Sequence, residues 1–459
     1  MNMPKKVIII GGGLSGLSLG VNLVDKGYRV EIIEKKSYLG GRASNKIDKI
    51  THDPVPIGPH ICINSYESFL KFLHKIGASA DICWERSKFL DYVYHGEHYH
   101  SKASRLPAPW YMMPMFFGYK YLNIFDKLSN IVFTSLIYFS SKTKLERFDE
   151  VTAYAFLKKY GVTDNSIAKL WRFFVLSMLN VPLEICSASE FCLLLKFWME
   201  INHGSIGFTK VGLGDLYTQK ASEYIRERGG SFIFNCSLEN INFEKAKIQN
   251  IEVKDKGIRK VLEADSYVST LNPLDLRDLL PQDLVFSDYF RPLNSYEPVP
   301  YISVNLWFDS KITDLKFWAL INDEQSSKYL NTDFYDQSNI YKHRKEKSFI
   351  TSNIIYSFPY HHLSDKEIVD KTLEELKKTF PKMQAKLVKY EVHRIPYVIY
   401  ASIPGMRSKK LSIQTPYSNF YLAGDWTYKK IPQCMEAAVR SGNECAEIIV
   451  NNTNKKYSI

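Results

Sequence analysis

The sequence of 459 residues contains only seven cysteines and no C-x-x-C pair. This argues against a disulfide framework, a zinc ribbon or an iron–sulfur site, so we expect a reduced, intracellular protein. The chain also lacks the roughly 20 uninterrupted apolar residues of a spanning helix. It has no G-x-S-x-G motif of a hydrolase nucleophile, no internal repeat and no low-complexity segment. With 45% hydrophobic residues, it is long enough for two or three globular domains.

Acidic residues are outnumbered by basic ones, 49 Asp and Glu against 60 Lys and Arg, which gives a net charge of +11. This excess favours an anionic partner such as membrane headgroups or a phosphorylated ligand. The basic residues are scattered, and we expect no nucleic acid partner. Three histidines within residues 95–100 superficially resemble a metal site, but their spacing predicts a hairpin that exposes alternate histidines. We therefore expect no metal.

The first motif that carries chemistry lies at the start of the chain. Residues 7–10 are a β-branched run that predicts a buried strand, and Gly11-x-Gly13-x-x-Gly16 follows directly. Such glycines allow a tight turn and close approach of a pyrophosphate to a helix N-terminus. Residues 29–34 predict a second strand that ends in an acid placed to bind ribose hydroxyls. This order predicts dinucleotide binding by Gly11, Gly13, Leu14, Ser15, Gly16, Glu34 and Lys35.

Two further segments resemble a flavoprotein superfamily. Gly40-Gly41-Arg42 is similar to the G-G-R signature of flavin amine oxidases and carotenoid desaturases. The resemblance implies that Gly41 passes close to FAD and that Arg42 neutralises its pyrophosphate. Gly58-Pro59-His60 is similar to the D-x-G-x-H loop beside the flavin, although Pro56 replaces the aspartate. His60 is the candidate catalytic residue that would face the substrate, and a histidine that only closes the loop is an equal alternative.

A third segment near the other end of the chain resembles the same superfamily. Gly424-Asp425 follows a predicted strand, and a helix expected to begin at Pro432 carries Met435. In the superfamily the aspartate binds the ribitol and phosphate region, and the helix N-terminus points at the flavin pyrimidine, where its dipole stabilises the reduced anion. A further similar segment implies that the backbone near Leu238 meets adenine. The resemblance therefore implies FAD as cofactor.

The order of these segments predicts a discontinuous cofactor domain. We expect a mixed α/β (α+β) fold with a Rossmann-like FAD-binding domain formed by residues 1–80, 205–275 and 405–459. Residues 81–204 and 276–404 would form an inserted substrate domain of mixed sheet and helices.

The stretch 106–139 is the most apolar part of the expected substrate domain. Charged residues interrupt it, so it cannot span a bilayer, but it is able to lie in a membrane interface. Its methionine and aromatic side chains equally suit a tunnel for a long unsaturated ligand, and plain helical core is the third interpretation. With the basic net charge, we favour contact with an anionic membrane from which a lipid substrate is drawn, through Trp110, Met112, Met113, Phe116 and Phe117.

Taken as a whole, the chain resembles the squalene-associated flavoproteins, the hydroxysqualene dehydroxylases, with plant- and cyanobacterial-type carotene desaturases as near relatives. Residues 105–110, 179–182 and 211–216 carry this resemblance. It implies hydride transfer between the flavin and an allylic carbon of a long isoprenoid. The alternatives are a phytoene or zeta-carotene type desaturase, a flavin amine oxidase, and a non-catalytic prenyl-binding protein of the Rab escort kind. A quinone or reductase would be the redox partner, and we expect a cytoplasmic protein peripheral on the inner face of the membrane.

Overall fold

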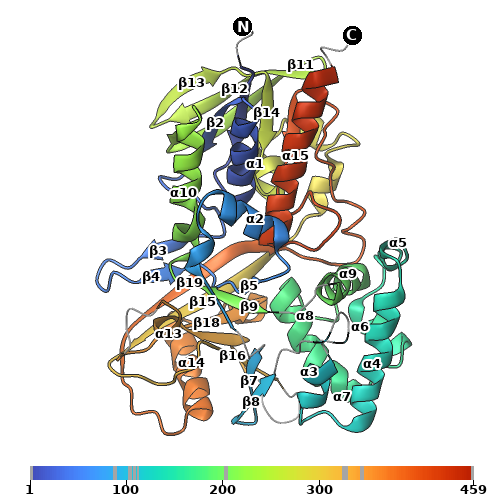
Figure 1. The fold of residues 1–459 in the computed structure, drawn as a ribbon, viewed down its shortest axis with the longest axis vertical. Coiled ribbons are helices and arrows are strands. Elements are labelled where there is room, and N and C mark those ends of the chain that lie inside the picture. Colours follow the sequence, from blue (N-terminus) through green and yellow to red (C-terminus); the bar gives the residue numbers. More distant parts are fainter. Residues whose placement is uncertain are drawn as a thin grey trace.

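The structure is a computed structural model that describes residues 4–85, 90–101, 106, 110, 113–200, 205–322, 329–341 and 346–455. It has two lobes, and both chain ends lie at the far end of one of them (Figure 1). We call this one the parallel-sheet lobe and the other the mixed-sheet lobe, after the sheets at their centres. The predicted class, a mixed α/β fold with a Rossmann-like sheet assembled from distant segments, is confirmed.

Five parallel strands form the centre of the parallel-sheet lobe, in the order β10-β2-β1-β14-β20. Their buried β-branched and aromatic residues suit inner strands that are covered on both faces. The bounds are β1 (Lys6–Ile10), β2 (Arg29–Glu34), β10 (Ser231–Phe234), β14 (Ser266–Ser269) and β20 (Phe420–Leu422). Parallel pairing brings the carboxyl ends of β1, β2 and β14 to one edge, where ligands of such sheets bind.

Helices cover one face of this sheet and a small antiparallel sheet covers the other. Alternate strand residues pack on helices in one core cluster and on the antiparallel strands in another. The helices are α1 (Leu14–Asp25), α2 (Glu67–Lys75), α10 (Leu213–Glu227) and α15 (Met435–Lys455). The opposite layer contains β11 (Cys236–Glu244), β12 (Lys247–Asp255), β13 (Ile258–Leu262), α11 (Pro273–Leu279), α12 (Gln282–Val285) and η4 (Arg291–Ser295).

Two details of this lobe differ from the sequence prediction. Helix α15 begins at Met435 rather than at Pro432, because the side chain of Gln433 bonds to the backbone of Tyr400 and keeps the preceding residues in a loop. Residues 276–295, assigned to the substrate domain, pack in the core of this lobe with Phe420. These residues come after β14 in the chain, and their apolar side chains cover the sheet. The chain therefore enters the mixed-sheet lobe only after residue 295.

Seven strands form the mixed sheet, in the order β19-β15-β18-β17-β16-β7-β8. One face packs on α14 (Asp365–Thr379), and the other faces a group of helices. The bounds are β7 (Leu90–Tyr94), β8 (Glu97–Ser101), β15 (Pro298–Phe308), β16 (Phe317–Leu320), β17 (Asp333–Asp336), β18 (Phe349–Ile355) and β19 (Leu387–Tyr400). The predicted histidine hairpin is confirmed as β7 and β8, joined at His95 and Gly96.

The helical part of this lobe is held by an aromatic core around Phe133, Trp171 and Phe191. Its elements are α3 (Met113–Gly118), α4 (Ile124–Phe139), α5 (Lys142–Glu146), α6 (Ala153–Lys159), α7 (Asp164–Ser166), η3 (Ile167–Trp171), α8 (Arg172–Leu179) and α9 (Ala188–Met199). Within the described ranges, every helix is too short or too polar to cross a bilayer.

Short elements connect the lobes or close their edges. They are β3 (Asn45–Ile47), β4 (Pro54–Pro56), β5 (Cys62–Ile63), β6 (Ile82–Trp84), β9 (Ile206–Thr209), η1 (Ser79–Asp81), α13 (Gln337–Tyr341) and η5 (Phe358–Tyr360). In Figure 1 the sheet formed by β5, β9 and β6 lies between the two lobes.

Candidate active site

One cavity of about 990 Å³ extends from the glycine loop of the parallel-sheet lobe to the inner face of the mixed sheet. Its polar end contains the residues that the sequence predicts for the cofactor, and its other end is apolar. Every predicted cofactor residue except Gly16 lines it, namely Gly11, Gly13, Leu14, Ser15, Glu34, Lys35, Gly41, Arg42, Gly58, Pro59, His60, Leu238, Gly424, Asp425 and Met435.

The glycine loop joins β1 to α1 and leaves room for a ligand. Gly11 has a φ of +110°, a conformation that side chains rarely adopt, and a Cβ on Gly13 would meet nothing within 4 Å. A Cβ on Gly16 would lie 2.1 Å from the Gly11 carbonyl oxygen, so Gly16 permits the helix to pack on the loop. Ser15 in the first turn has a buried hydroxyl that no group in the described part of the chain bonds. These features suit the binding of an anion at the N-terminus of α1.

Glu34 closes β2 at the edge of the cavity and is buried. Its carboxylate accepts hydrogen bonds from the Gly12 amide at 2.8 Å and from the Lys36 amide at 2.9 Å. These bonds aim the carboxylate from the strand end toward the glycine loop. Lys35 lies beside it and pairs with Asp275 at 3.2 Å.

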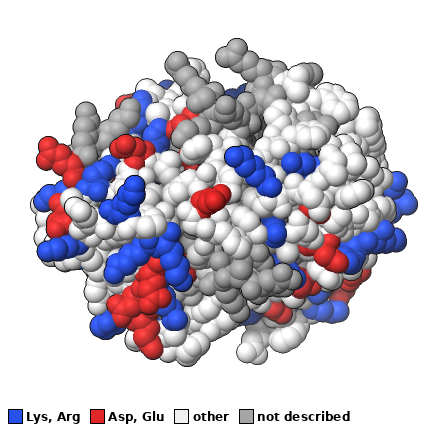
Figure 2. Space-filling model, turned by 90° about the horizontal axis from the view of Figure 1, so that it is seen from below, with Lys and Arg blue, Asp and Glu red and all other residues white. Residues whose placement is uncertain are grey.

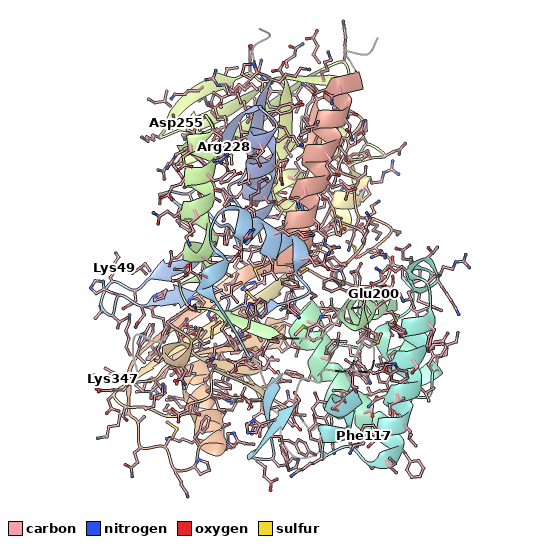
Figure 3. All side chains as sticks on the ribbon, viewed as in Figure 1. Lys49, Phe117, Glu200, Arg228, Asp255 and Lys347 are labelled. Atoms are coloured by element: carbon pink, nitrogen blue, oxygen red, sulfur yellow. The ribbon has the colours of Figure 1, made fainter. Side chains whose placement is uncertain are left out.

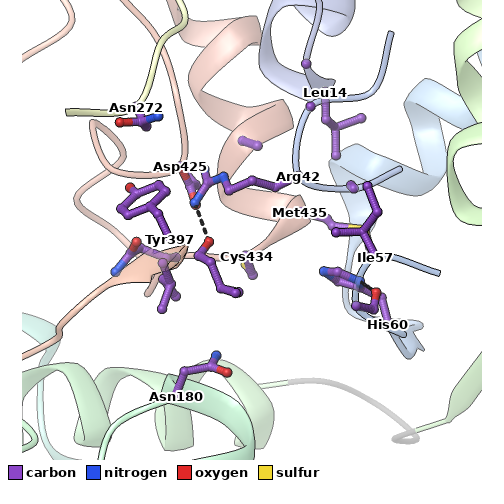
Figure 4. A pocket seen from close by; sticks show the side chains of 18 of the residues that line it. Leu14, Arg42, Ile57, His60, Asn180, Asn272, Tyr397, Asp425, Cys434 and Met435 are labelled. Atoms are coloured by element: carbon purple, nitrogen blue, oxygen red, sulfur yellow. Dashed lines mark hydrogen bonds and ion pairs between the residues drawn. The ribbon is translucent and has the colours of Figure 1, made fainter. Parts of the chain in front are cut away.

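Arg42 and Asp425 connect the two ends of the sequence across the cavity (Figure 4). The guanidinium Nη2 lies 2.6 Å from the Asp425 carboxylate, and Nη1 donates to the Val398 carbonyl at 3.0 Å. Burial opposes the positive charge, but Asp425 and Tyr397 raise the pKa of Arg42 above its ordinary value. The arginine therefore stays charged in the cavity.

His60 lies on the loop between β4 and β5. Its ring lines the cavity and is accessible from it, although this part of the cavity lies deep in the molecule. Its Nδ1 is 2.6 Å from the Gly58 carbonyl oxygen. Burial and then the charge of Arg42 lower the pKa of His60, while the Gly58 carbonyl opposes the shift. The imidazole is accordingly neutral at pH 7.

The C-terminal segment forms the wall opposite the glycine loop. Gly424 has a φ of +156°, and a Cβ there would lie 2.8 Å from the Trp426 ring. Met435 opens α15, so the N-terminal end of this long helix points into the cavity with Gln433 and Cys434 beside it. The burial of Cys434 raises the pKa of its thiol to about 12, which keeps it protonated.

Several lining residues are absent from the sequence prediction. Thr270, Leu271 and Asn272 directly follow β14, whose carboxyl end lies at the ligand-binding edge. That rule identifies them once residues 266–269 are recognised as a strand of the parallel sheet. The apolar end carries no local sequence motif, because it forms where helices pack against the mixed sheet. The helices contribute Trp171, Phe174 and Trp198, and the sheet contributes Tyr301, Phe317, Asp333, Tyr335, Asn353 and Ile355.

Of the residues predicted for a tunnel or membrane contact, the structure describes the side chains of two. Trp110 and Phe117 are 48% and 51% exposed and do not line the cavity, and Phe117 is at the outer edge of the mixed-sheet lobe (Figure 3). Met112 lies outside the described residues, as do the side chains of Met113 and Phe116, whose backbones belong to α3. Of the stretch 106–139, Tyr119 reaches the cavity.

The sequence profile of flavin containing amine oxidoreductases matches residues 14–450 of this chain. The chain belongs to that family. Members of the family bind FAD, and this flavin oxidoreductase is an FAD-dependent enzyme.

Known proteins similar to this flavin oxidoreductase cover nearly its whole length. It is 27% identical to a 15-cis-phytoene desaturase of an Oncidium hybrid cultivar, over 99% of this chain and 79% of that protein. It is 24% identical to a zeta-carotene desaturase of Synechocystis sp., over 97% of both chains. Its fold matches cyclohexylamine oxidase from Brevibacterium oxydans with a TM-score of 0.71 at 16% identity, over 98% of this chain and 100% of the other.

The polar end of the cavity fits the FAD of this family. The open space at Gly13 and the unbonded Ser15 hydroxyl suit a pyrophosphate at the α1 N-terminus. Arg42 provides a fixed positive charge, and the N-terminal end of α15 provides a positive dipole on the opposite side. Bound FAD supplies a two-electron acceptor or donor, while the chain positions the substrate and excludes water.

Proposed function

We propose that this flavin oxidoreductase desaturates a long linear isoprenoid of the phytoene or zeta-carotene type. The observation that carries the proposal is the continuity of the cavity, which leads from the cofactor residues into an end walled by Trp171, Phe174 and Trp198. An aromatic, apolar end suits an extended hydrocarbon, which offers no hydrogen-bonding groups. The similarity to two kinds of carotene desaturase along the full chain supports the same substrate class.

We further propose the residues that hold FAD. Gly11, Gly13 and Ser15 would bind the pyrophosphate, and Glu34 would bind the adenosine ribose. Arg42 and Asp425 would neutralise and orient the phosphate and ribitol region, and Leu238 would lie at the adenine. The neutral His60 is a candidate to border the flavin on its substrate side. These roles follow from the lining of one cavity by all of these residues.

We propose contact with an anionic membrane as the source of substrate and of a quinone that reoxidises the flavin. Helix α4 exposes an apolar face. It includes Phe125 (72% exposed), Leu128 (50%) and Val132 (66%), which share one side of the helix because they are three and four positions apart. Exposed Lys120 precedes the helix and Lys142 follows it. The face of the molecule seen in Figure 2 shows lysine and arginine side chains, with aspartate and glutamate side chains among them, beside uncharged areas. Apolar residues flanked by lysines suit insertion among anionic headgroups.

A second candidate is the reductive removal of an allylic hydroxyl, as in hydroxysqualene dehydroxylases. One observation favours it. The apolar end of the cavity holds the polar pair Asp333 and Asn353, to which a hydroxyl-bearing substrate is able to hydrogen-bond and a pure hydrocarbon is not. The electron flow is opposite in the two candidates, so an experiment separates them.

The experiment compares both redox directions without oxygen. Protein loaded with oxidised FAD is mixed with vesicles that contain phytoene or zeta-carotene, and protein loaded with reduced FAD is mixed with vesicles that contain hydroxysqualene. We expect bleaching of oxidised flavin and a product with a longer conjugated system in the first arm. Squalene formation in the second arm without a reaction in the first would replace desaturation by dehydroxylation. Consumption of none of the substrates would overturn both candidates.

A further inference from the structure

Asp333 is a carboxylic acid in the apolar end of the cavity. It opens β17, lines the cavity and is only 5% exposed. Its partner in the sheet is Asn353 on β18, whose Nδ2 donates to the carboxyl at 2.6 Å. The Oδ1 atom of the same asparagine is buried without a hydrogen-bond partner in the described part of the chain. A pair with only a structural role would be expected to satisfy both groups.

The surroundings of Asp333 leave its charge uncompensated. Among the described residues it makes no ion pair, and burial raises the pKa of the carboxyl to about 7, with the Asn353 bond opposing the shift. The titratable groups that face it are Tyr301 on β15 and Tyr335 on β17. Burial and Asp333 raise the pKa of both phenols, so both stay protonated. On β16 the residue opposite Asp333 is Ala319. The carboxyl is thus able to hold or release a proton near neutral pH.

The position of Asp333 connects it to the cofactor end of the cavity. Tyr301 lies two positions along the sheet face from the Asp333–Asn353 pair, and its ring carbon Cε1 is 3.9 Å from the point where a Cβ on Gly58 would stand. Gly58 belongs to the loop that carries His60 and lines the same cavity. One tyrosine ring therefore separates the carboxyl from the loop beside the proposed flavin position.

We propose that Asp333 is the catalytic residue that takes up the proton lost by the substrate. The inference rests on the proposed desaturation. Each new double bond requires loss of one hydrogen as hydride, which goes to the oxidised FAD of this family, and of one proton from the adjacent carbon. The Asp333 carboxylate accepts that proton, and the electron pair of the broken C–H bond becomes the second bond between the two carbons. Asn353 positions the carboxylate, and the protonated acid releases its proton after product departure.

The first test uses pH and a matched control. Asp333→Asn keeps the size of the side chain and an acceptor for Asn353. The control, Asp336→Asn, changes a second buried carboxyl of β17. Asp336 accepts a hydrogen bond from Ser348 and does not line the cavity. Burial also raises the pKa of Asp336, to about 6. We expect flavin reduction by phytoene in a single turnover to rise with pH through about 7 in the original protein and in Asp336→Asn. In Asp333→Asn it should be at least about 100-fold slower and independent of pH.

The second test needs neither turnover nor the true substrate. Dodecyltrimethylammonium, used below its micelle concentration, has a permanent positive charge and an apolar chain, so the pH dependence of its binding reports groups on the protein. We expect binding, measured by perturbation of the flavin absorbance, to strengthen about tenfold as Asp333 ionises. Asp333→Asn should remove this rise, and Asp336→Asn should keep it. Dodecanol should bind equally at each pH.

The outcomes separate the two proposals. Unchanged pH profiles in Asp333→Asn, with phytoene still consumed, would overturn the role of Asp333 and leave desaturation standing. Equal binding of the ammonium probe by the original protein and Asp333→Asn would also overturn it, because the carboxyl would then not titrate toward the cavity. A failure of phytoene and zeta-carotene to react, with the ammonium result as expected, would overturn desaturation while Asp333 remains the titrating group of the cavity.

Discussion

The guanidinium of Arg42 lies 2.6 Å from the carboxylate of Asp425, a residue 383 positions further along the chain. This ion pair joins two segments that line the polar end of the cavity. Arg42 lies on the segment after β2, and Asp425 lies on the segment after β20. The pair is partly shielded from water, with the Asp425 side chain 9% and the Arg42 side chain 38% exposed. Loss of either partner leaves the other charge partly buried and alone.

We expect Asp425→Ala to weaken FAD retention at least about tenfold, because the polar contact to the cofactor and the partner of Arg42 are both lost. Flavin absorbance after dialysis measures the effect. Arg228→Ala, which removes a partly exposed arginine of the α10 C-terminus, is the control and should keep its flavin. Full flavin occupancy in Asp425→Ala would exclude the proposed role.

The two glycines of the loop should respond differently to alanine. At Gly13 the new Cβ points into open space and φ is −76°, so we expect folding stability within about 1 kcal/mol of the original and FAD affinity at least about tenfold lower. At Gly16 the Cβ would collide with the Gly11 carbonyl, so Gly16→Ala should lose about 1–3 kcal/mol of stability. Denaturation curves and flavin titration of both variants measure this. Equal losses of stability would contradict the distinction.

Exposed apolar residues of α4 should contribute to vesicle binding. We expect the double change Phe125→Ser and Val132→Ser to reduce sedimentation with anionic vesicles at least about tenfold, since each buried side chain contributes about 1.5–3 kcal/mol. Phe286→Ser is the matched control, because Phe286 is 65% exposed but lies in the parallel-sheet lobe after α12. If both variants sediment like the original protein, α4 is not the membrane contact.

Asp333 should make stability depend on pH. Its pKa of about 7 in the folded protein lies above the ordinary 3.8, so folding is favoured by protonation. This contribution is complete below pH 4, falls as pH rises and is lost above about 7. Asp333→Asn should therefore stabilise the protein by about 2 kcal/mol at pH 8 and by less at pH 5.

Denaturation at the two pH values checks this prediction with Asp309→Asn as a contrast. Backbone hydrogen bonding by Lys386 lowers the pKa of Asp309, so its replacement should reduce stability at pH 8. A stability gain in Asp333→Asn that is the same at pH 5 and pH 8 would mean that the carboxyl does not titrate in this range.

Residues named from the sequence line the polar end of the cavity, whereas the sequence names few residues of its apolar end, for a physical reason. Gly11, Gly13 and Glu34 act through turn geometry and strand ends that short motifs encode. Asp333 and Asn353 become neighbours only through the pairing of β17 with β18, which depends on the register of the whole sheet. Trp171 and Trp198 approach the cavity only when η3 and α9 pack, and no local pattern distinguishes them from ordinary core residues.

Strand β19 has a mechanical consequence. Its first residues, with Leu387 and Val392, pack in the core of the mixed-sheet lobe, and its last residue, Tyr400, lies in the core of the parallel-sheet lobe. Hydrogen bonds to β15 run along almost all of its length. Because β19 stays paired with β15 along this path, a motion of one lobe relative to the other has to bend the paired strands together. For the proposed isoprenoid substrate we therefore expect lengthwise entry into a cavity that is already formed, without closure of the lobes around it.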